Sequence, residues 1–332
     1  MADTPTDLDV VCVGNAIVDV LAQTDDANIE RLGMAKGGMS LIDAHEAEAL
    51  YREMAPGVET SGGSAGNTAA GLASLGSRVA YIGKVADDQL GGIFRHDIRA
   101  IGAEFDTPPA VGGPPTARCL IFITPDAERT MNTFLGACVE LGPEDIDGDL
   151  LARAKVTYLE GYLWDRDAAK QAFLKAAKLA HGAGRRVSLT LSDAFCVDRH
   201  RDSFRELING HIDILFANEA EILSLYQTDN FDEALQHVRH DCAIVALTRS
   251  EKGSVIVDGD EVHVVDAIPV AKVVDTTGAG DQFAAGFLHG LTHGRSLYDC
   301  GRLGGIAAAE VIAHVGPRPQ VSLKELAAKT LG

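Results

Sequence analysis

Asp275-Thr276-Thr277-Gly278-Ala279-Gly280-Asp281 is the stretch that decides the fold of this chain. An apolar run suited to a β-strand, residues 268–274, leads into it. Apolar residues at helical spacing follow it as far as Leu291. The pattern predicts a strand-to-helix turn, with Asp281 in the first turn of the helix.

The small residues of this turn favour an anion-binding site. Backbone N–H groups at a helix start lack intrahelical partners and carry the positive end of the helix dipole. Because Gly278, Ala279 and Gly280 have little or no side chain, an anion can approach their amides closely. Asp281 at the rim would accept a proton from a hydroxyl that attacks a phosphorus. The alternative is a glycine-rich turn in which Asp281 is an ordinary first-turn acid.

Two motifs together resemble a known family. The stretch from Asp275 to Asp281 resembles the second signature of the ribokinase-like (PfkB) carbohydrate kinases, and Ser61-Gly62-Gly63-Ser64-Ala65-Gly66-Asn67-Thr68-Ala69 resembles the first. They occur in the family's order, and the resemblance covers nearly the whole chain, closest to the adenosine kinase branch. It implies one ribokinase-like α/β domain over residues 1–332, with segments at about 15–45 and 107–136 forming a small β-sheet lid.

The second half of the chain alternates between strand and helix patterns. We expect strands at 156–159, 187–191, 212–216 and 243–248, and helices at 168–181, 203–209 and 232–240. Such alternation predicts a doubly wound, mostly parallel sheet flanked by helices. Ligands of such sheets bind at the carboxyl ends of the strands.

Composition excludes several classes of protein. The chain has 332 residues, 46% of them apolar, which is enough for a large α/β core. Its 48 acidic and 29 Lys and Arg residues give a formal charge of −19, which disfavours nucleic acid and anionic membranes as partners. The six cysteines show no metal spacing and indicate reduced core residues. Without a signal peptide or a membrane-length apolar run, a cytoplasmic protein is expected.

The resemblance assigns an acceptor site to the first third of the chain. It places Asn15 in the lining and Asp19 as the carboxylate that holds two sugar hydroxyls, a task that suits an acceptor of two O–H bonds. An acceptor hydroxyl can lie against the bare backbone of Gly62 and Gly63, and Asn67 can both donate and accept. The alternatives are a solvated Asp19 on an edge strand and a tight helix–strand junction at the two glycines.

The resemblance also assigns nucleotide and ion sites. Asn218 and Glu221 match a motif that organises Mg²⁺-bound waters and phosphates, and Mg²⁺ tends to keep several of its waters. The alternative is that the acids of this motif favour a helix start. Thr248 and Gly253 fit the family's nucleotide loop, in which Ser250 replaces the usual first glycine.

Three further residues complete the implied phosphoryl-transfer site. Arg129 matches a lid arginine whose planar fork reaches the transferred phosphoryl group; the alternative is an exposed strand arginine. Asp275 and Thr277 match ligand positions of a monovalent cation, so activation by K⁺ is a hypothesis.

The implied activity is phosphoryl transfer from ATP, with Mg²⁺, to a primary hydroxyl. Phe195 aligns with an aromatic residue that lines a base slot, and Met39, Tyr162 and Leu163 fall nearby on the same alignment. This favours adenosine, converted to AMP, over a free sugar such as ribose, fructose or a keto-deoxy acid. An aromatic residue after a strand is, however, more often part of a core. Monomer and homodimer both stay open.

Two other classes of function compete. A dinucleotide-binding oxidoreductase is disfavoured because no G-x-G-x-x-G follows the first strand, and no Walker motif is present. A non-catalytic nucleoside-binding protein would keep Asp19, Gly62, Gly63 and Asn67 but would not need Asp281. Because both motifs are present, a catalytic role is preferred.

Overall fold

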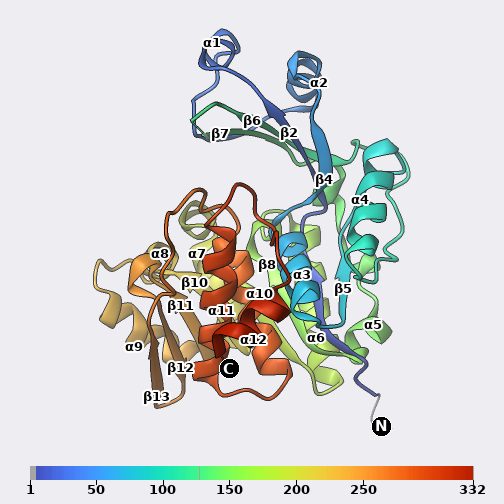
Figure 1. Ribbon diagram of the computed structural model, residues 1–332. Helices are drawn as coiled ribbons and strands as arrows, with labels where there is room; N and C mark the ends of the chain where they lie inside the picture. Colours follow the sequence, from blue (N-terminus) through green and yellow to red (C-terminus); the bar gives the residue numbers. More distant parts are fainter. Residues whose placement is uncertain (1–4, 127, 332) are drawn as a thin grey trace.

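The computed structural model describes residues 5–126 and 128–331, and their largest element is an eight-stranded sheet (Figure 1). The strand order is β13-β12-β11-β10-β9-β8-β1-β5. The bounds are β1 Leu8–Val13, β5 Val79–Ile82, β8 Ala154–Glu160, β9 Arg186–Thr190, β10 Ile214–Asn218, β11 Ile244–Thr248, β12 Ser254–Asp258 and β13 Glu261–Val265. All pairs from β5 to β11 are parallel, while β12 and β13 add an antiparallel edge. The predicted mostly parallel sheet is confirmed.

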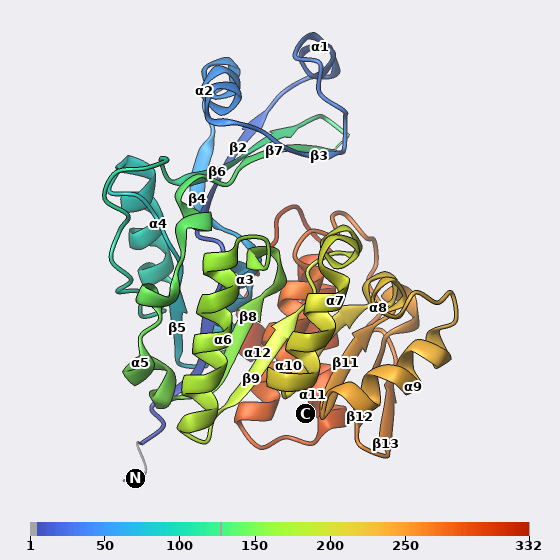
Figure 2. The ribbon, with the colours of Figure 1, turned by 180° about the vertical axis from the view of Figure 1, so that it is seen from behind.

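Helices cover both faces of this sheet (Figures 1 and 2). One layer holds α3 Ser64–Leu75, α4 Gln89–Ala100, α10 Ala279–Thr292, α11 Leu297–Val311 and α12 Leu323–Leu331; the other holds α5 Gly148–Arg153, α6 Asp167–Gly182, α7 Ala194–His211, α8 Glu219–Tyr226 and α9 Phe231–Asp241. Every residue of β1 is buried, and its side chains alternate between two core clusters. Burial on both faces accounts for the uninterrupted apolar run from Val10 to Val13. Among the described helices, none combines the length and apolar character needed to span a bilayer.

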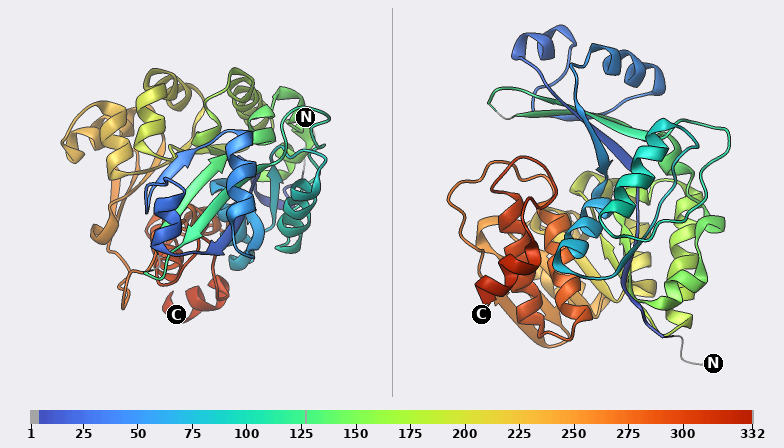
Figure 3. Two further views of the ribbon diagram at one scale, coloured as in Figure 1. Left: turned by 90° about the horizontal axis from the view of Figure 1, so that it is seen from above. Right: turned by 45° about the vertical axis from the view of Figure 1, so that its right-hand side comes forward.

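A second, five-stranded sheet forms the lid (Figures 1 and 3). Its order is β3-β7-β6-β2-β4, with β2 Ile17–Gln23, β3 Met39–Leu41, β4 Val58–Gly62, β6 Ala117–Ile123 and β7 Arg129–Phe134. Two short helices, α1 Asp26–Arg31 and α2 Ala44–Glu53, lie on its outer side (Figure 1). Strand β4 lies outside the two expected lid segments, so three parts of the chain build the lid. Because β4 leads directly into α3, the lid is joined to the helix that carries the first motif.

Two predictions of local structure were wrong. Residues 268–274 form no strand; they run irregularly, and the Val274 amide donates to the Ile312 carbonyl at 2.8 Å. Pro269 has no N–H for a strand ladder, and the β12–β13 hairpin already forms this edge of the sheet. The helix expected at 203–209 begins earlier, at Ala194, and contains a break at His200 (φ −128°).

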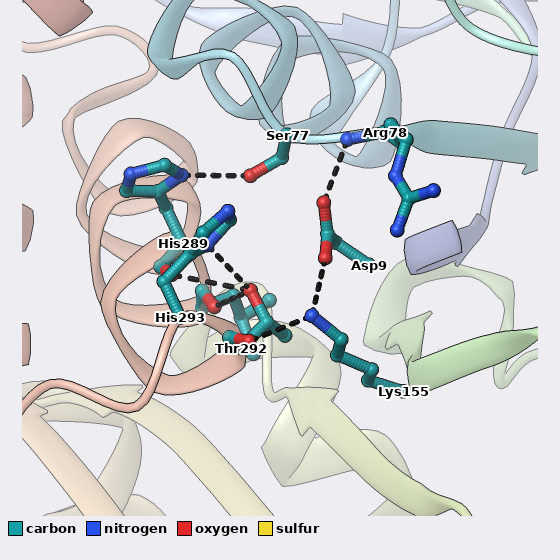
Figure 4. A network of polar contacts seen from close by, with 8 residues as sticks. Asp9, Ser77, Arg78, Lys155, His289, Thr292 and His293 are labelled. Atoms are coloured by element: carbon teal, nitrogen blue, oxygen red, sulfur yellow. Dashed lines mark hydrogen bonds and ion pairs between the residues drawn. The ribbon is translucent and has the colours of Figure 1, made fainter. Parts of the chain in front are cut away.

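Polar contacts fix the far end of α10 against the amino edge of the sheet (Figure 4). Asp9, at the start of β1, accepts from Lys155 Nζ at 2.8 Å, and the same ammonium donates to the Thr292 carbonyl at 2.8 Å. The Ser77 hydroxyl and His289 Nδ1 lie 2.8 Å apart. The C-terminal end of α10 is thereby held in place, which also fixes where its first turn stands.

Candidate active site

Three of the predicted site residues lie at the carboxyl edge of the large sheet. Asn15 follows the end of β1, Asn218 ends β10, and Thr248 ends β11. Only three residues separate the end of β1 from the first lid strand, so this edge lies next to the lid (Figure 1). This is where a doubly wound sheet binds its ligands.

The turn from Asp275 to Asp281, here called the anion turn, leads into a helix as predicted, but its free amides are not the three that were expected. Gly278 is the N-cap of α10 at φ 79°, and a Cβ there would lie 2.6 Å from Pro317 Cβ. The Ala279 amide donates to the Thr276 carbonyl at 3.2 Å, which departs from its expected role as an anion donor. The amides of Gly278, Gly280 and Asp281 make no hydrogen bond within the described residues. These three are therefore the available donors.

Asp281 joins the two signature motifs. Its Oδ1 accepts from the Ser64 hydroxyl at 2.6 Å, and its Oδ2 accepts from Asn67 Nδ2 at 3.0 Å. Burial raises the pKa of Asp281 to about 6, although both hydrogen bonds favour the charged form. The carboxylate is therefore ionised at neutral pH and is a stronger base than an ordinary aspartate.

The two glycines of the first motif are required by packing around Asp19. A Cβ at Gly62 would lie 2.4 Å from Asp19 Cγ, and a Cβ at Gly63, where φ is 82°, would lie 2.3 Å from the Asn15 carbonyl oxygen. The tight junction thus makes room for a carboxylate from the neighbouring strand. Burial raises the pKa of Asp19 to about 6, while the guanidinium groups of Arg318 and Arg129 act in the opposite direction.

Glu160 is a site residue that the motifs did not reveal. It is buried at the end of β8, and it accepts from Asn15 Nδ2 at 2.8 Å and from the Ala65 amide at 2.8 Å. Burial raises the pKa of Glu160 to about 7. The carboxylate fixes Asn15 against the start of α3 and leaves Asn15 Oδ1 without a partner in the described chain. Its position at a strand end was the only available signal.

Arg129 is buried rather than an exposed strand arginine. Only 6% of its surface is accessible, and its Nη1 lies 3.2 Å from Asp275 Oδ2. Nonetheless, Nε, Nη1 and Nη2 make no hydrogen bond within the described residues. A buried guanidinium whose one ionic partner is Asp275, and whose N–H groups make no hydrogen bond in the described chain, is suited to bind an anion.

Asp275 ties three segments together. It accepts from the Thr277 amide at 2.9 Å, from the Thr277 hydroxyl at 2.6 Å and from the Gly316 amide at 3.0 Å. Burial acts to raise the pKa of Asp275, but these hydrogen bonds and the charge of Arg129 outweigh it and hold the pKa below its ordinary value. Both carboxylate oxygens already have partners in this arrangement.

Asn218 and Glu221 form a reciprocal helix cap at the start of α8. The Glu221 amide donates to Asn218 Oδ1 at 2.8 Å, and the Asn218 amide donates to Glu221 Oε2 at 3.0 Å. Burial raises the pKa of Glu221 to about 7. The helix-start alternative therefore describes a real structural role of both residues. No cluster of three or more His, Cys, Asp or Glu side chains suited to a metal ion occurs in the described ranges.

The structure explains the unusual serine of the predicted nucleotide loop. Ser250 has φ 53°, a left-handed conformation that glycine adopts at no steric cost. Gly253 has φ 81°, and a Cβ there would lie 2.0 Å from the Val265 carbonyl oxygen. Thr248 ends β11 directly before this loop. Ser250 thus keeps the glycine-like conformation and adds a hydroxyl.

Three of the four residues expected near a base slot are exposed. Phe195, in the first turn of α7, is 68% exposed, Met39 in the lid is 52% exposed and Tyr162 is 39% exposed. Leu163 is only 2% exposed and belongs to the core, so it is not available to a ligand. Large apolar side chains are therefore accessible both on the lid and on the sheet domain.

The chain is similar to known kinases over nearly its whole length. Residues 8–323 match the description "pfkB family carbohydrate kinase". The chain is 58% identical in sequence to adenosine kinase from Sinorhizobium meliloti, and the match covers 98% of this chain and 99% of that one. The TM-score to the crystal structure of that protein is 0.89. It is 57% identical to a probable sugar kinase from Rhizobium etli (TM-score 0.90), over 98% of each chain. Adenosine kinase of Saccharomyces cerevisiae is 27% identical, over 93% of this chain and 96% of its own.

Proposed function

We propose that this chain, which belongs to the pfkB family of carbohydrate kinases, phosphorylates a nucleoside at a primary hydroxyl. The proposed acceptor is adenosine and the proposed donor is MgATP. The family relationship makes it a phosphotransferase that acts on an alcohol group. Within that class, the donor, the acceptor and the role of each residue are the proposal.

The observation that carries the proposal is the setting of Asp281. A basic carboxylate, oriented by Ser64 and Asn67, stands beside the free amides of Gly280 and of Asp281 itself. In the proposed reaction, Asp281 accepts the proton of the acceptor hydroxyl. The hydroxyl oxygen then bonds to the γ-phosphorus, and the bond from that phosphorus to the bridging oxygen of ADP breaks. A positioned base contributes roughly 10²- to 10⁴-fold to such a step.

The anion turn and the lid would stabilise the charge on the transferred group. The free amides at the start of α10 would donate to the γ-phosphoryl oxygens, and one such donor is worth about 10²- to 10³-fold. Arg129 brings a buried guanidinium from lid strand β7 to the same place, where it now lies beside Asp275. Lid closure would bring these charges together and exclude water as a competing acceptor.

Magnesium would enter with the phosphates of the nucleotide. The buried Glu221 could orient its waters, because Mg²⁺ usually keeps several of them. Mg²⁺ supplies charge neutralisation on the phosphate oxygens. Asn218, Thr248, Ser250 and Gly253 stay the proposed nucleotide-binding residues.

We favour adenosine because exposed apolar side chains occur both in the lid and just after the carboxyl ends of β8 and β9. A purine needs apolar faces as well as polar groups for the ribose, and Phe195, Tyr162 and Met39 supply accessible ones. Asp19 and Asn67 would bind the ribose hydroxyls. The alternative, a free sugar, is kept because one of the two closely similar solved proteins is described as a probable sugar kinase.

A panel of acceptors tests the proposal. The purified chain is incubated with MgATP and adenosine, ribose, fructose, a 2-keto-3-deoxy sugar acid or no acceptor, and ADP and the phosphorylated product are quantified. We expect equimolar ADP and AMP with adenosine, and a kcat/KM for adenosine above that for every sugar. A preference for a sugar would replace the acceptor. ADP release that does not depend on an acceptor would contradict the kinase reaction itself.

A further inference from the structure

The loop after α11 carries an arginine that belongs to neither signature motif. The Gly316 amide donates to Asp275 Oδ2 at 3.0 Å, and Gln282 Nε2 donates to the Pro317 carbonyl at 3.0 Å, so the loop is bonded to the anion turn and to α10. Arg318 follows directly and lies between two prolines. Proline fixes its own φ and restricts the residue before it. The backbone of Arg318 is therefore held in place before a ligand binds.

The guanidinium of Arg318 points into the proposed acceptor site. Its Nε donates to Asn67 Oδ1 at 3.4 Å, while its Nη2 is covered and has no hydrogen-bond partner in the described part of the chain. Burial lowers the pKa of Arg318, and the negative charges of Asp19 and Asp97 oppose this by stabilising the charged guanidinium. Asp97 is already engaged, because it accepts from the Thr60 hydroxyl and from the Ser61 amide, both at 2.8 Å.

Asp19 is the carboxylate that stays available. Its side chain accepts no hydrogen bond from the described residues, whereas the free Nη2 of Arg318 offers a donor in the same site. A sugar hydroxyl can donate its proton to a carboxylate and accept from a guanidinium at the same time. The pair of free groups therefore matches the hydrogen-bonding pattern of a hydroxyl.

We propose that Arg318 is a further acceptor-binding residue, whose Nη2 donates to one of two vicinal ribose hydroxyls that are also bound by Asp19. This inference rests on the proposed nucleoside acceptor. A deoxy analogue that lacks the hydroxyl leaves a buried donor and a carboxylate without partners, which costs binding energy. Arg318 thereby selects ribonucleosides over deoxyribonucleosides.

Arg318 also affects the charge of Asp19. The positive charge of Arg318 opposes the burial that raises the pKa of Asp19 to about 6. Without the guanidinium this pKa rises further, so a larger fraction of Asp19 is protonated near neutral pH. In Arg318→Met, the KM for the acceptor should therefore increase more steeply than in the wild type as the pH is lowered from 8.5 to 6.5.

The test is a cycle of variants and analogues. We would measure kcat and KM of the wild type, Arg318→Met and Arg318→Lys with adenosine, 2′-deoxyadenosine and 3′-deoxyadenosine, and check folding by circular dichroism and thermal unfolding. Arg318→Met should lose about 10- to 100-fold in kcat/KM with adenosine, mainly through KM. With one of the two deoxy analogues, the kcat/KM of Arg318→Met should equal that of the wild type, because this analogue lacks the hydroxyl that Arg318 binds.

Two variants keep this result interpretable. Arg318→Lys keeps the charge and should preserve the wild-type dependence of KM on pH while losing part of the discrimination. Arg239→Met is the matched control, since Arg239 pairs with Asp260 on the β12–β13 hairpin and should leave all ratios unchanged.

Equal losses on adenosine and both analogues, with an unchanged pH dependence of KM, would overturn the role of Arg318. Failure of the wild type to phosphorylate adenosine would instead contradict the proposed acceptor. In that case the same measurements are made with the sugar that the wild type phosphorylates and with the deoxy forms of that sugar. They then show whether Arg318 binds an acceptor hydroxyl.

Discussion

Gly280→Ala separates the fold of the anion turn from its function. Gly280 is the second residue of α10, and no atom lies within 4 Å of a Cβ built there. The substitution therefore creates no clash and gains up to about 1 kcal/mol of helix propensity. Packing does not require glycine at this position, in contrast to Gly278, where φ is 79° and Pro317 is in contact.

Turnover requires glycine at 280 because the transferred phosphoryl group must approach the amides of this turn closely. A methyl group in that space would displace the transferred group by about 1 Å, which typically costs on the order of 10²-fold. We expect Gly280→Ala to unfold at or above the wild-type temperature while kcat/KM falls by about 10²-fold. The assay is coupled ADP release with the preferred acceptor, alongside thermal unfolding.

Gly92→Ala is the matched control for this experiment. Gly92 lies in α4, and no atom lies within 4 Å of a Cβ built there either. It should show the same neutral or positive effect on stability with unchanged turnover. Wild-type turnover in Gly280→Ala would refute the idea that the amides of this turn face the reacting phosphate.

Three further predictions concern charge. Because burial raises the pKa of Asp281 to about 6 and the base must be ionised, kcat/KM should fall at least about tenfold per pH unit below 6, measured from pH 5 to 8, and the protonation of Asp19 adds to this fall; a flat profile would argue against this base. Burial and the nearby His293 lower the pKa of His289 to about 4 from its ordinary 6.5, so the unfolded chain binds more protons between these values and the free energy of unfolding falls as pH drops through that window. In urea titrations at pH 7 and 5, His289→Gln should lose less stability than the wild type; equal losses would exclude His289 as the cause. If Asp275 and Thr277 bind a monovalent cation, turnover should rise when K⁺ is added to buffer free of Na⁺ and K⁺, and identical rates would count against it.

The central elements of the fold could be predicted because their patterns are local. The strands predicted at 187–191 and 243–248 correspond to β9 Arg186–Thr190 and β11 Ile244–Thr248, within one residue at each end, because short apolar runs alternate there with helical patterns. The strand predicted at 268–274 was wrong because an apolar composition alone does not place a strand in a sheet. The edge of the large sheet is formed instead by β12 and β13, whose pairing depends on contacts that the sequence pattern does not encode.

The candidate site divides in a similar way. Asp281 and Asn67 were predicted because they lie in the two signature motifs, and Asp19 because the family resemblance extends to the start of the chain. The structure brings Asn67 and Asp281 into contact across 214 positions of sequence. Glu160 and Arg318 were missed because neither has a local signal: one is an acid at a strand end, and the other lies in a proline-containing loop. Their roles arise only when the chain folds Ala65 and Asn67 against them.

A sharp test of whether Asp281 is the base is the turnover of Asp281→Asn, measured together with its binding of MgATP. Asparagine keeps the size of the side chain and one acceptor for the Ser64 hydroxyl but is not a base. We expect kcat to fall by at least roughly a hundredfold while the nucleotide still binds and the chain stays folded. Turnover close to that of the wild type would contradict it.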